Sequence, residues 1–321
     1  MKPRVRIAGI GSVCLPGDAG EGVRAAFSRR LAAAIDAQTT NGHRVRLVHT
    51  IEEVAFLAAV EAFALAGRAV PAECDRTGIA LGLDEGIDGI KADHCLAVAR
   101  EGPTGASPLH FPFTAPNSVA AQISIALDLR GESVTFCGGA LSGAHALGHA
   151  LQAVREGRQA AMLAGAATSV TESFLEGLLH AGHGHGERPL DAACLLLLDA
   201  REKPLRRAAG DVPMLLGFGE GAGDGGARDA LLACLDDAGI APGAIGAAWI
   251  AGSGDDPRLV EAVRRAGVSG PLRRSPHCDS FSAVFPLTLA AALRRPGGGP
   301  PAPFLVVATD CWGSAAAAVA R

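Results

Sequence analysis

The amino-acid sequence predicts an α/β protein built from two similar halves. Short apolar runs, typical of buried strands, alternate with longer segments in which apolar residues recur at helical spacing. This alternation favours a layered fold with a mostly buried sheet. The succession also occurs twice, because a helix ending at Ala66-Gly67, a turn at Pro71 and an apolar run are followed later by Ala238-Gly239, Pro242 and a second such run. We therefore expect a duplicated βαβ core.

Nine apolar runs bounded by glycine, proline or charged residues are the expected strands. They cover residues 4–13, 77–83, 133–137, 160–166, 194–198, 214–219, 247–251, 304–309 and 315–320. Six segments carry helical spacing, namely residues 51–66, 119–127, 142–155, 228–238, 257–266 and 281–294. The helix expected over residues 142–155 is small or apolar on almost every side, which is typical of a helix enclosed by other elements. We expect it and its counterpart over residues 281–294 to be central.

The two halves are expected to span residues 1–200 and 201–321. Between them, residues 199–211 carry several charged side chains and Pro204, which break the apolar pattern. Within the second half, the proline- and glycine-rich stretch 296–303 predicts a surface turn before the last two strands.

Composition narrows the class of protein. Of the 321 residues, 49% are hydrophobic and 19% charged, so burial of apolar surface can offset chain entropy and we expect a compact protein. Only 4% are aromatic, none is tyrosine, and the formal net charge is -4, which disfavours nucleic acid as a partner. No uncharged apolar run approaches the ~18 residues that cross a membrane. The eight cysteines form no C-x-x-C pair, so we expect reduced thiols, no metal or other cofactor, and a cytoplasmic location.

Residues 131–147, GESVTFCGGALSGAHAL, have the form of a strand, a tight glycine turn and a buried helix. A helix N-terminus offers amide donors and the positive end of the helix dipole to a thiolate or an oxyanion, so an acyl-transfer nucleophile would be placed here. The segment resembles the nucleophile elbow of the β-ketoacyl synthases, condensing enzymes of the thiolase fold, whose pattern is R-G-P-S-V-T-x-x-T-A-C-S-S-S-x-x-A-L.

Other segments resemble the same family, in the same order along the chain. VRIAGIGSVCL (residues 5–15) is similar to the family's opening V-x-I-T-G-I-G-x-x-x-P-L, and FPFTAPNS (111–118) is similar to F-x-x-x-x-P-N. RPLD (188–191), LLLLD (195–199) and CWGS (311–314) resemble R-P-F-D, L-V-L-E and a degraded G-F-G-G-T-N. The resemblance implies a thiolase-like fold in which two duplicated βαβ halves form α-β-α-β-α layers.

The resemblance also indicates which positions would carry the family's chemistry. Alignment of the elbow without a gap places Ala140 where the family has its acyl-accepting cysteine, and no thioester can form on a methyl group. The stretch IAGSGD (250–255) resembles H-G-T-G-T and has Ala251 at the first catalytic histidine. The stretch PHCDSFSA (276–283) resembles G-H-T-x-G-A-A-G and keeps His277 at the second, either to bond a thioester carbonyl or as a core histidine.

With Ala140 and Ala251, the chain lacks covalent capture of the acyl group and half of the imidazole pair that polarises the malonyl thioester. The resemblance therefore implies a non-condensing subunit similar to the chain length factors. Such a subunit pairs as a heterodimer with an active β-ketoacyl synthase and shapes its acyl tunnel in type II polyketide, aryl polyene or fatty-acid-like biosynthesis. The expected partners are that synthase, an acyl carrier protein and an acyl thioester chain.

Two other interpretations stay open. One is an active acyl-thioester enzyme, an acyltransferase, hydrolase or decarboxylase, that uses Cys137, Ser142 or His277 in altered chemistry. Cys137 lies on the strand side of the turn, where the helix amides do not point, and its alternative interpretation is a buried apolar thiol. The other is a homodimeric acyl-binding scaffold that needs no synthase. A stable adduct after incubation with acyl carrier protein thioesters would favour the enzyme.

Overall fold

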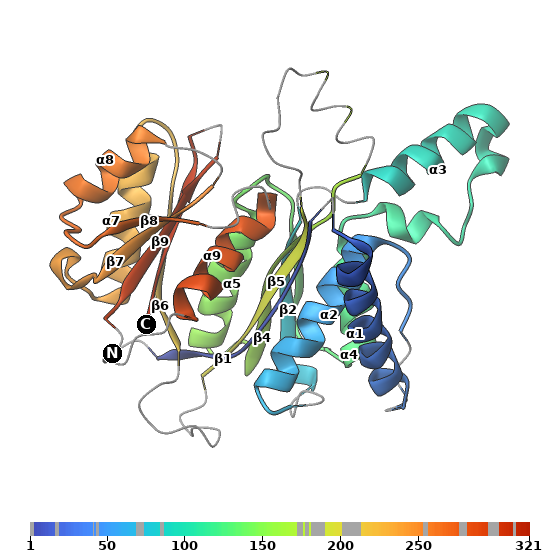
Figure 1. Ribbon diagram of the computed structural model, residues 1–321, viewed down its shortest axis with the longest axis horizontal. Coiled ribbons are helices and arrows are strands. Elements are labelled where there is room, and N and C mark those ends of the chain that lie inside the picture. Colours follow the sequence, from blue (N-terminus) through green and yellow to red (C-terminus); the bar gives the residue numbers. More distant parts are fainter. Residues whose placement is uncertain are drawn as a thin grey trace.

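The protein is built in five layers. The structure, a computed structural model, describes residues 3–16, 19–40, 42, 45–68, 74–83, 87–171, 176, 180, 190–200, 213–252, 256–275, 281–294, 302–310 and 313–321. Figure 1 shows helices on both outer sides, two groups of strands inside them, and a pair of helices in the centre. This confirms the expected α-β-α-β-α architecture.

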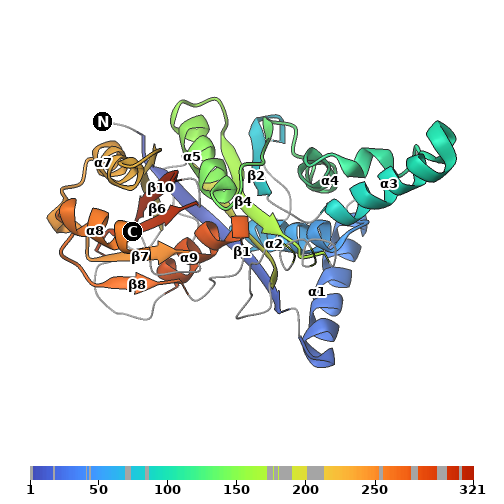
Figure 2. The same cartoon turned by 90° about the horizontal axis from the view of Figure 1, so that it is seen from above.

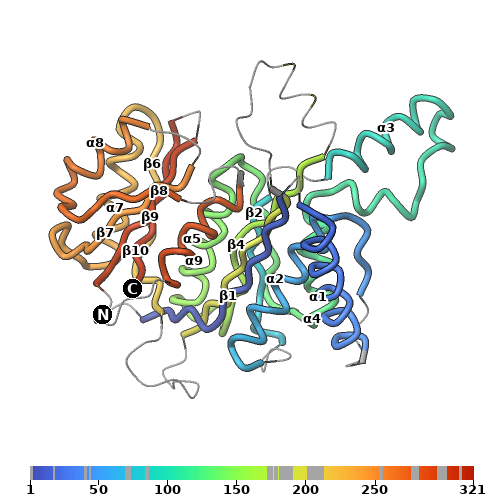
Figure 3. Tube along the Cα trace, in the orientation of Figure 1, coloured from blue at the N-terminus to red at the C-terminus, as the bar shows by residue number. Residues whose placement is uncertain are grey.

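Each half of the chain contributes five strands to one ten-stranded sheet. The first half supplies β1 (Val5–Pro16), β2 (Thr77–Leu83), β3 (Ser133–Phe136), β4 (Ala161–Thr168) and β5 (Leu190–Asp199). The second supplies β6 (Met214–Gly221), β7 (Ala247–Ala251), β8 (Leu272–Arg274), β9 (Phe304–Thr309) and β10 (Ala315–Ala320). Tracing the tube in Figure 3 from blue to red, one group of strands is completed before the other begins.

The two halves repeat one strand topology. The sheet order is β3-β2-β4-β5-β1-β6-β10-β9-β7-β8, so from each outer edge inwards both halves read third, second, fourth, fifth and first strand. In both halves the second strand is parallel to the third and fourth, and the fifth is antiparallel to its neighbours. The expected duplication is therefore confirmed. The boundary at residue 200 stays a prediction, because residues 201–212 lie outside the described residues.

The helices form three layers, one on each outer face of the strands and one in the centre. On the first half's outer face lie α1 (Glu21–Thr40), α2 (Thr50–Leu65) and α4 (Asn117–Leu127), and on the second half's lie α7 (Gly226–Ala238) and α8 (Pro257–Arg265). Helices α5 (Ser142–Arg155) and α9 (Val284–Leu293) fill the central layer, and Figure 2 shows α3 (Asp88–Glu101) projecting away from the layers. Among the described residues, no helix is long and apolar enough to span a bilayer.

Strand alternation separates three hydrophobic cores. On β5 the even-numbered residues from 194 to 198 face the central helices, whereas the odd-numbered residues from 193 to 197 face α2. The same alternation places Ala251 of β7 in the central core and Ile250 in the core beneath α7 and α8. Continuous apolar runs in the sequence thus reflect strands that are buried on both faces.

Four elements differ from the sequence-based expectations. Helix α1 was not expected, although its buried side chains at positions 27, 31, 34 and 38 follow helical spacing. Helix α3 buries only Ile90 among its residues, and the three residues of β8 are all exposed, so neither element has an apolar pattern to detect. The helix expected from residue 281 begins instead as a 3-10 turn, Phe281–Ala283, before α9. Pro286 is accommodated in the first turn of α9, where its missing N–H has no helical partner to lose.

Candidate active site

The turn that joins β3 to α5 is held by one glycine and one serine hydroxyl. Gly139 has a φ of 76°, in the left-handed region that favours glycine. The buried Ser142 Oγ accepts a hydrogen bond from Gly138 N at 2.8 Å and donates one to Gly139 O at 2.8 Å. Because its proton is already given to a backbone carbonyl, the Ser142 hydroxyl fixes the turn and is poorly placed to act as a nucleophile.

Ala140 lies between this turn and α5, two residues before the helix begins, and is half-buried. The first amides of a 14-residue helix and the positive end of its dipole follow directly. This is the local geometry in which a thiolate or an oxyanion would be stabilised. The methyl side chain of Ala140 has no atom that can accept an acyl group.

The first turns of the two central helices pack directly on each other. A Cβ atom built on Gly143 would lie 2.4 Å from Ser282 O, 2.8 Å from Ala166 Cβ and 3.0 Å from Pro286 Cδ, so glycine is required for this approach. Ser282 Oγ donates a hydrogen bond to Ala167 O at 3.2 Å. The start of α5, the end of β4 and the entry to α9 therefore meet at one end of the central layer.

The end of β7 lies close to the entry to α9. Ala251 is the last residue of β7 and is buried in the same central core as α5. Beside it, Ser275 N donates to Ile250 O at 2.9 Å, and Thr288 Oγ1 of α9 donates to Ser275 Oγ at 2.6 Å. The structure thus places Ala251 beside the segment that leads into α9. His277, the other expected imidazole position, lies outside the described residues.

Three of the described cysteines, Cys137, Cys194 and Cys234, show two contrasting environments. Cys137 follows β3 at the turn and is exposed, so the expectation of a buried apolar thiol is wrong at this position. Cys194 on β5 and Cys234 on α7 are buried, and desolvation by burial raises the pKa of each thiol far above its usual value. Cys137 is therefore an accessible sulfur beside the turn, whereas Cys194 and Cys234 are inert core residues.

A capping carboxylate beside β7 was missed by the sequence analysis. Asp256 Oδ1 accepts a hydrogen bond from Arg258 N at 3.0 Å, and Asp256 Oδ2 accepts one from Thr309 Oγ1 at 3.2 Å. Partial burial alone would raise the pKa of Asp256, but the hydrogen bonds from Arg258 and Thr309 hold it below its usual value. The Asp256-Pro257 pair, an N-cap followed by proline at the first helical position, was the available signal.

A histidine-lined cavity at the base of α3 was also missed. It has a volume of about 320 Å³ and is lined by His49, His94 and His110, together with Asp93 and Ser107. These residues come from separate segments, so no local pattern in the sequence joins them. Among the described residues, no group of three or more histidine, cysteine, aspartate or glutamate side chains is placed to hold a metal ion.

A repeated five-layer α/β fold, with a glycine turn before the N-terminus of a central helix, is the architecture of the thiolase-like condensing enzymes. The family model described as the β-ketoacyl synthase N-terminal domain matches residues 24–188, which is just over half of the chain. The chain belongs to the β-ketoacyl synthase family.

Solved structures of similar fold come from several branches of this family. A type II PKS acyl-carrier protein in complex with its ketosynthase bound to the hexaketide aligns with a TM-score of 0.77 at 15% identity, over 100% of both chains. The ishigamide ketosynthase/chain length factor aligns with a TM-score of 0.72 at 21% identity, over 99% of both. A β-ketoacyl synthase from Burkholderia phymatum STM815 aligns with a TM-score of 0.77 at 19% identity, over 100% of this chain and 99% of that one.

Curated relatives match over a shorter stretch. The 3-oxoacyl-[acyl-carrier-protein] synthase 2 of Vibrio harveyi is 38% identical over 93 residues, which is 29% of this chain and 22% of that protein. The protein of the same name from Vibrio cholerae serotype O1 (strain ATCC 39315 / El Tor Inaba N16961) is 34% identical over 93 residues. The matched segment therefore spans about a fifth of the length of these relatives.

Proposed function

We propose that this chain is a non-condensing ketosynthase-like subunit, which pairs with an active β-ketoacyl synthase and shapes the acyl tunnel of that enzyme. The observation that carries the proposal is Ala140, a methyl group in the turn that leads into the N-terminus of α5. Condensation in this family begins with transfer of the acyl chain to a cysteine at the elbow. A chain with alanine at this position cannot hold the acyl group covalently there.

Ala251 supports the same conclusion independently. At the end of β7 it is 2% exposed, so a methyl group occupies the position that resembles the first catalytic histidine. Two imidazoles share the negative charge that develops on the thioester oxygen as malonyl decarboxylates. Loss of one such donor typically costs on the order of 10²–10³ in rate.

The edge of the sheet supports pairing with a second ketosynthase-type chain. β3 is an outer strand of the sheet formed by the described residues, and its only strand neighbour there is β2. Its first residue, Ser133, is exposed. An open strand edge is a surface that proteins cover by pairing. Addition of the equivalent partner strand would continue the sheet across a dimer, and we expect a permanent interface of more than ~2,000 Å².

The pathway partners follow from the relatives. A ketosynthase is paired with a chain length factor in one similar structure and is bound to an acyl-carrier protein in another. Carried over to this chain, these imply an active synthase, an acyl carrier protein and an acyl thioester in type II polyketide, aryl polyene or fatty-acid-like biosynthesis. The active partner would be the ketosynthase, and this chain would contribute wall residues to the tunnel.

The deciding experiment measures elongation and covalent capture together. The purified chain is incubated with acyl and malonyl carrier protein, alone and after coexpression with an active β-ketoacyl synthase. Intact mass spectrometry and product analysis follow. We expect no adduct and no product from the chain alone, and product from the pair. Elongation by the chain alone would overturn the proposal and the placement of Ala140.

A matched pair of variants tests the register of the elbow. In Ala140→Cys, the introduced thiol stands beside the helix amides, so its alkylation should be faster than that of Cys95, an exposed thiol within α3. Acylation without elongation is expected, because Ala251 supplies no donor. Ala140→Cys combined with Ala251→His is the smallest change expected to restore any product. If the introduced thiol is alkylated no faster than Cys95, the alignment that places Ala140 at the cysteine position of the elbow is wrong.

One observation favours a second function, an active acyl-thioester enzyme with altered chemistry. Cys137 is exposed beside the turn, so an acyltransferase, hydrolase or decarboxylase using this thiol or His277 is the competing proposal. A thioester adduct on the wild-type chain that disappears in Cys137→Ser, and persists in Cys95→Ser, would establish it. A homodimer that stays intact in sedimentation and ignores the synthase would instead favour an acyl-binding scaffold.

A further inference from the structure

A second pocket lies far from the elbow, where the two halves of the chain join. It has a volume of about 500 Å³ and is lined from both halves, by the residues before β1, the end of α5, the start of β6, the end of α7 and the residue after β10. Arg155, which lines it, is the last residue of α5. Since α5 has 14 residues and rises ~1.5 Å per residue, the pocket lies ~20 Å from the elbow, at the opposite end of the helix.

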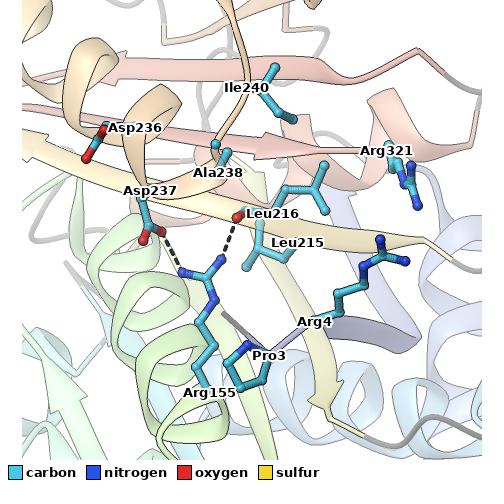
Figure 4. A pocket seen from close by; sticks show the side chains of 11 residues that line it. Pro3, Arg4, Arg155, Leu215, Leu216, Asp236, Asp237, Ala238, Ile240 and Arg321 are labelled. Atoms are coloured by element: carbon cyan, nitrogen blue, oxygen red, sulfur yellow. Dashed lines mark hydrogen bonds and ion pairs between the residues drawn. The ribbon is translucent and has the colours of Figure 1, made fainter. Parts of the chain in front are cut away.

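One wall of the pocket is rigid and electrically balanced. Arg155 Nη1 donates to Asp237 Oδ2 at 2.6 Å, and Arg155 Nη2 donates to Leu216 O (Figure 4). Asp237 Oδ2 also accepts from Phe218 N at 3.1 Å. The guanidinium and carboxylate of this wall therefore pair with each other and link α5 to α7 and β6.

The opposite side of the pocket carries positive charge that the described residues do not neutralise. Arg4 and Arg321 both line the pocket, and no carboxylate of the described residues forms an ion pair with either. Figure 4 shows Asp236 on the far side of the pocket from these two arginines. Arg4 and Arg321 thus present two guanidinium groups to one space.

The remaining lining is apolar. Leu215, Leu216, Ala238 and Ile240 contribute hydrocarbon surface between the balanced wall and the two arginines. A volume of about 500 Å³ falls within the range of pockets that enclose small organic molecules. The pocket therefore combines space for an apolar group with two planar, positively charged guanidinium groups.

We propose that this pocket binds a soluble phosphate monoester with a compact apolar organic group. Guanidinium groups match phosphate oxygens through paired hydrogen bonds, so Arg4 and Arg321 can each donate to one phosphate group. The leucine and isoleucine side chains would cover the organic group. Because the lining comes from both halves, an occupied pocket stabilises their junction. This inference is independent of the chemistry at Ala140.

The test follows thermal unfolding of the full chain with hexyl phosphate, inorganic phosphate and hexanol as probes. We expect a saturable rise in Tm with hexyl phosphate, half-saturation at a concentration at least about tenfold lower than for inorganic phosphate, and no saturable rise with hexanol. Equal effects of hexyl phosphate and hexanol would show that the anion is not recognised and would overturn the proposal, as would the absence of saturation.

Variants locate the site. Arg4→Gln and Arg321→Gln should each weaken hexyl phosphate binding about tenfold, because each removes a charged hydrogen-bond donor. Both residues are exposed, so the variants should keep the wild-type Tm without ligand. Arg228→Gln, an exposed arginine on the first turn of α7 outside the pocket, is the matched control and should bind as the wild type does. Equal loss in the control would reveal a general charge effect and refute the site.

Discussion

The junction of the halves contains a buried cluster of three charges, Arg6, Asp199 and Arg68. Asp199 ends β5 and is fully buried. Its Oδ1 accepts from Arg6 Nε at 2.6 Å, and its Oδ2 accepts from Arg6 Nη2 at 2.8 Å and from Arg68 Nη2 at 2.7 Å. The Arg6 and Arg68 side chains are only 7% and 10% exposed. Asp199 is therefore the counter-ion of two guanidinium groups that water barely reaches.

Asp199→Ala should destabilise the protein strongly. Removing one member of a buried ion pair typically costs about 3–5 kcal/mol, because the remaining charge is left without compensation. Here two guanidinium groups lose the same partner, so we expect the upper part of that range. The exposed pair Arg30–Glu61, with side chains 50% and 31% exposed, is the matched control. Glu61→Ala should cost about 0.2–1 kcal/mol, as surface ion pairs do.

Urea unfolding of the wild type and both variants at pH 7, followed by far-UV circular dichroism, measures the difference. The midpoint should fall much further in Asp199→Ala than in Glu61→Ala. If Asp199→Ala does not form a folded protein, Asp199→Asn keeps the shape and removes the charge, and should lie between the two. Equal midpoints for Asp199→Ala and Glu61→Ala would refute the argument that burial decides the cost.

Three further outcomes are expected. Gly148→Val should lower the free energy of unfolding by about 1–3 kcal/mol in urea titrations, because a Cβ atom there would lie 2.2 Å from the Phe218 ring. Burial lowers the pKa of His49 from 6.5, so the unfolded chain binds a proton at this imidazole more tightly than the folded chain does. The free energy of unfolding should therefore fall as the pH drops below 6.5, and the slope of this fall should be shallower in His49→Gln. In native thiol titration Cys95 should react, whereas Cys194, whose pKa burial raises, should react only after unfolding.

The fold could be inferred from the sequence because its main signals are local. A strand buried on both faces is a continuous apolar run, and a central helix such as α5 has small or apolar residues on most sides. Elements that bury little carry no such signal. Helix α3 buries one residue and β8 buries none, so neither element has an apolar pattern of its own from which it could be predicted.

In the candidate site, too, local features could be predicted from the sequence and long-range features could not. The turn before α5 could be found because Gly139 and Ser142 are neighbours in sequence, and the contacts that shape the turn join residues at most four apart. The packing of Gly143 on Ser282 joins residues far apart in sequence, and so do the histidine-lined cavity and the arginine pocket. Such features depend on how the layers stack, which a single sequence does not encode in any short pattern.

The elbow retains constraints that folding alone does not explain. The start of a helix does not require a residue with a φ of 76°, as Gly139 has, or a buried hydroxyl that bridges Gly138 and Gly139, as Ser142 supplies. Nor does it require packing so close that only glycine fits, as at position 143. Gly139 and Ser142 fix the path of the turn that contains Ala140, and Gly143 brings the start of α5 against the entry to α9 and the end of β4. Under the proposed function, with alanine at position 140, this geometry does not serve covalent capture. In the proposed non-condensing subunit, this geometry would instead fix the shape of the acyl tunnel, because a tunnel wall needs a fixed backbone and small side chains at this place.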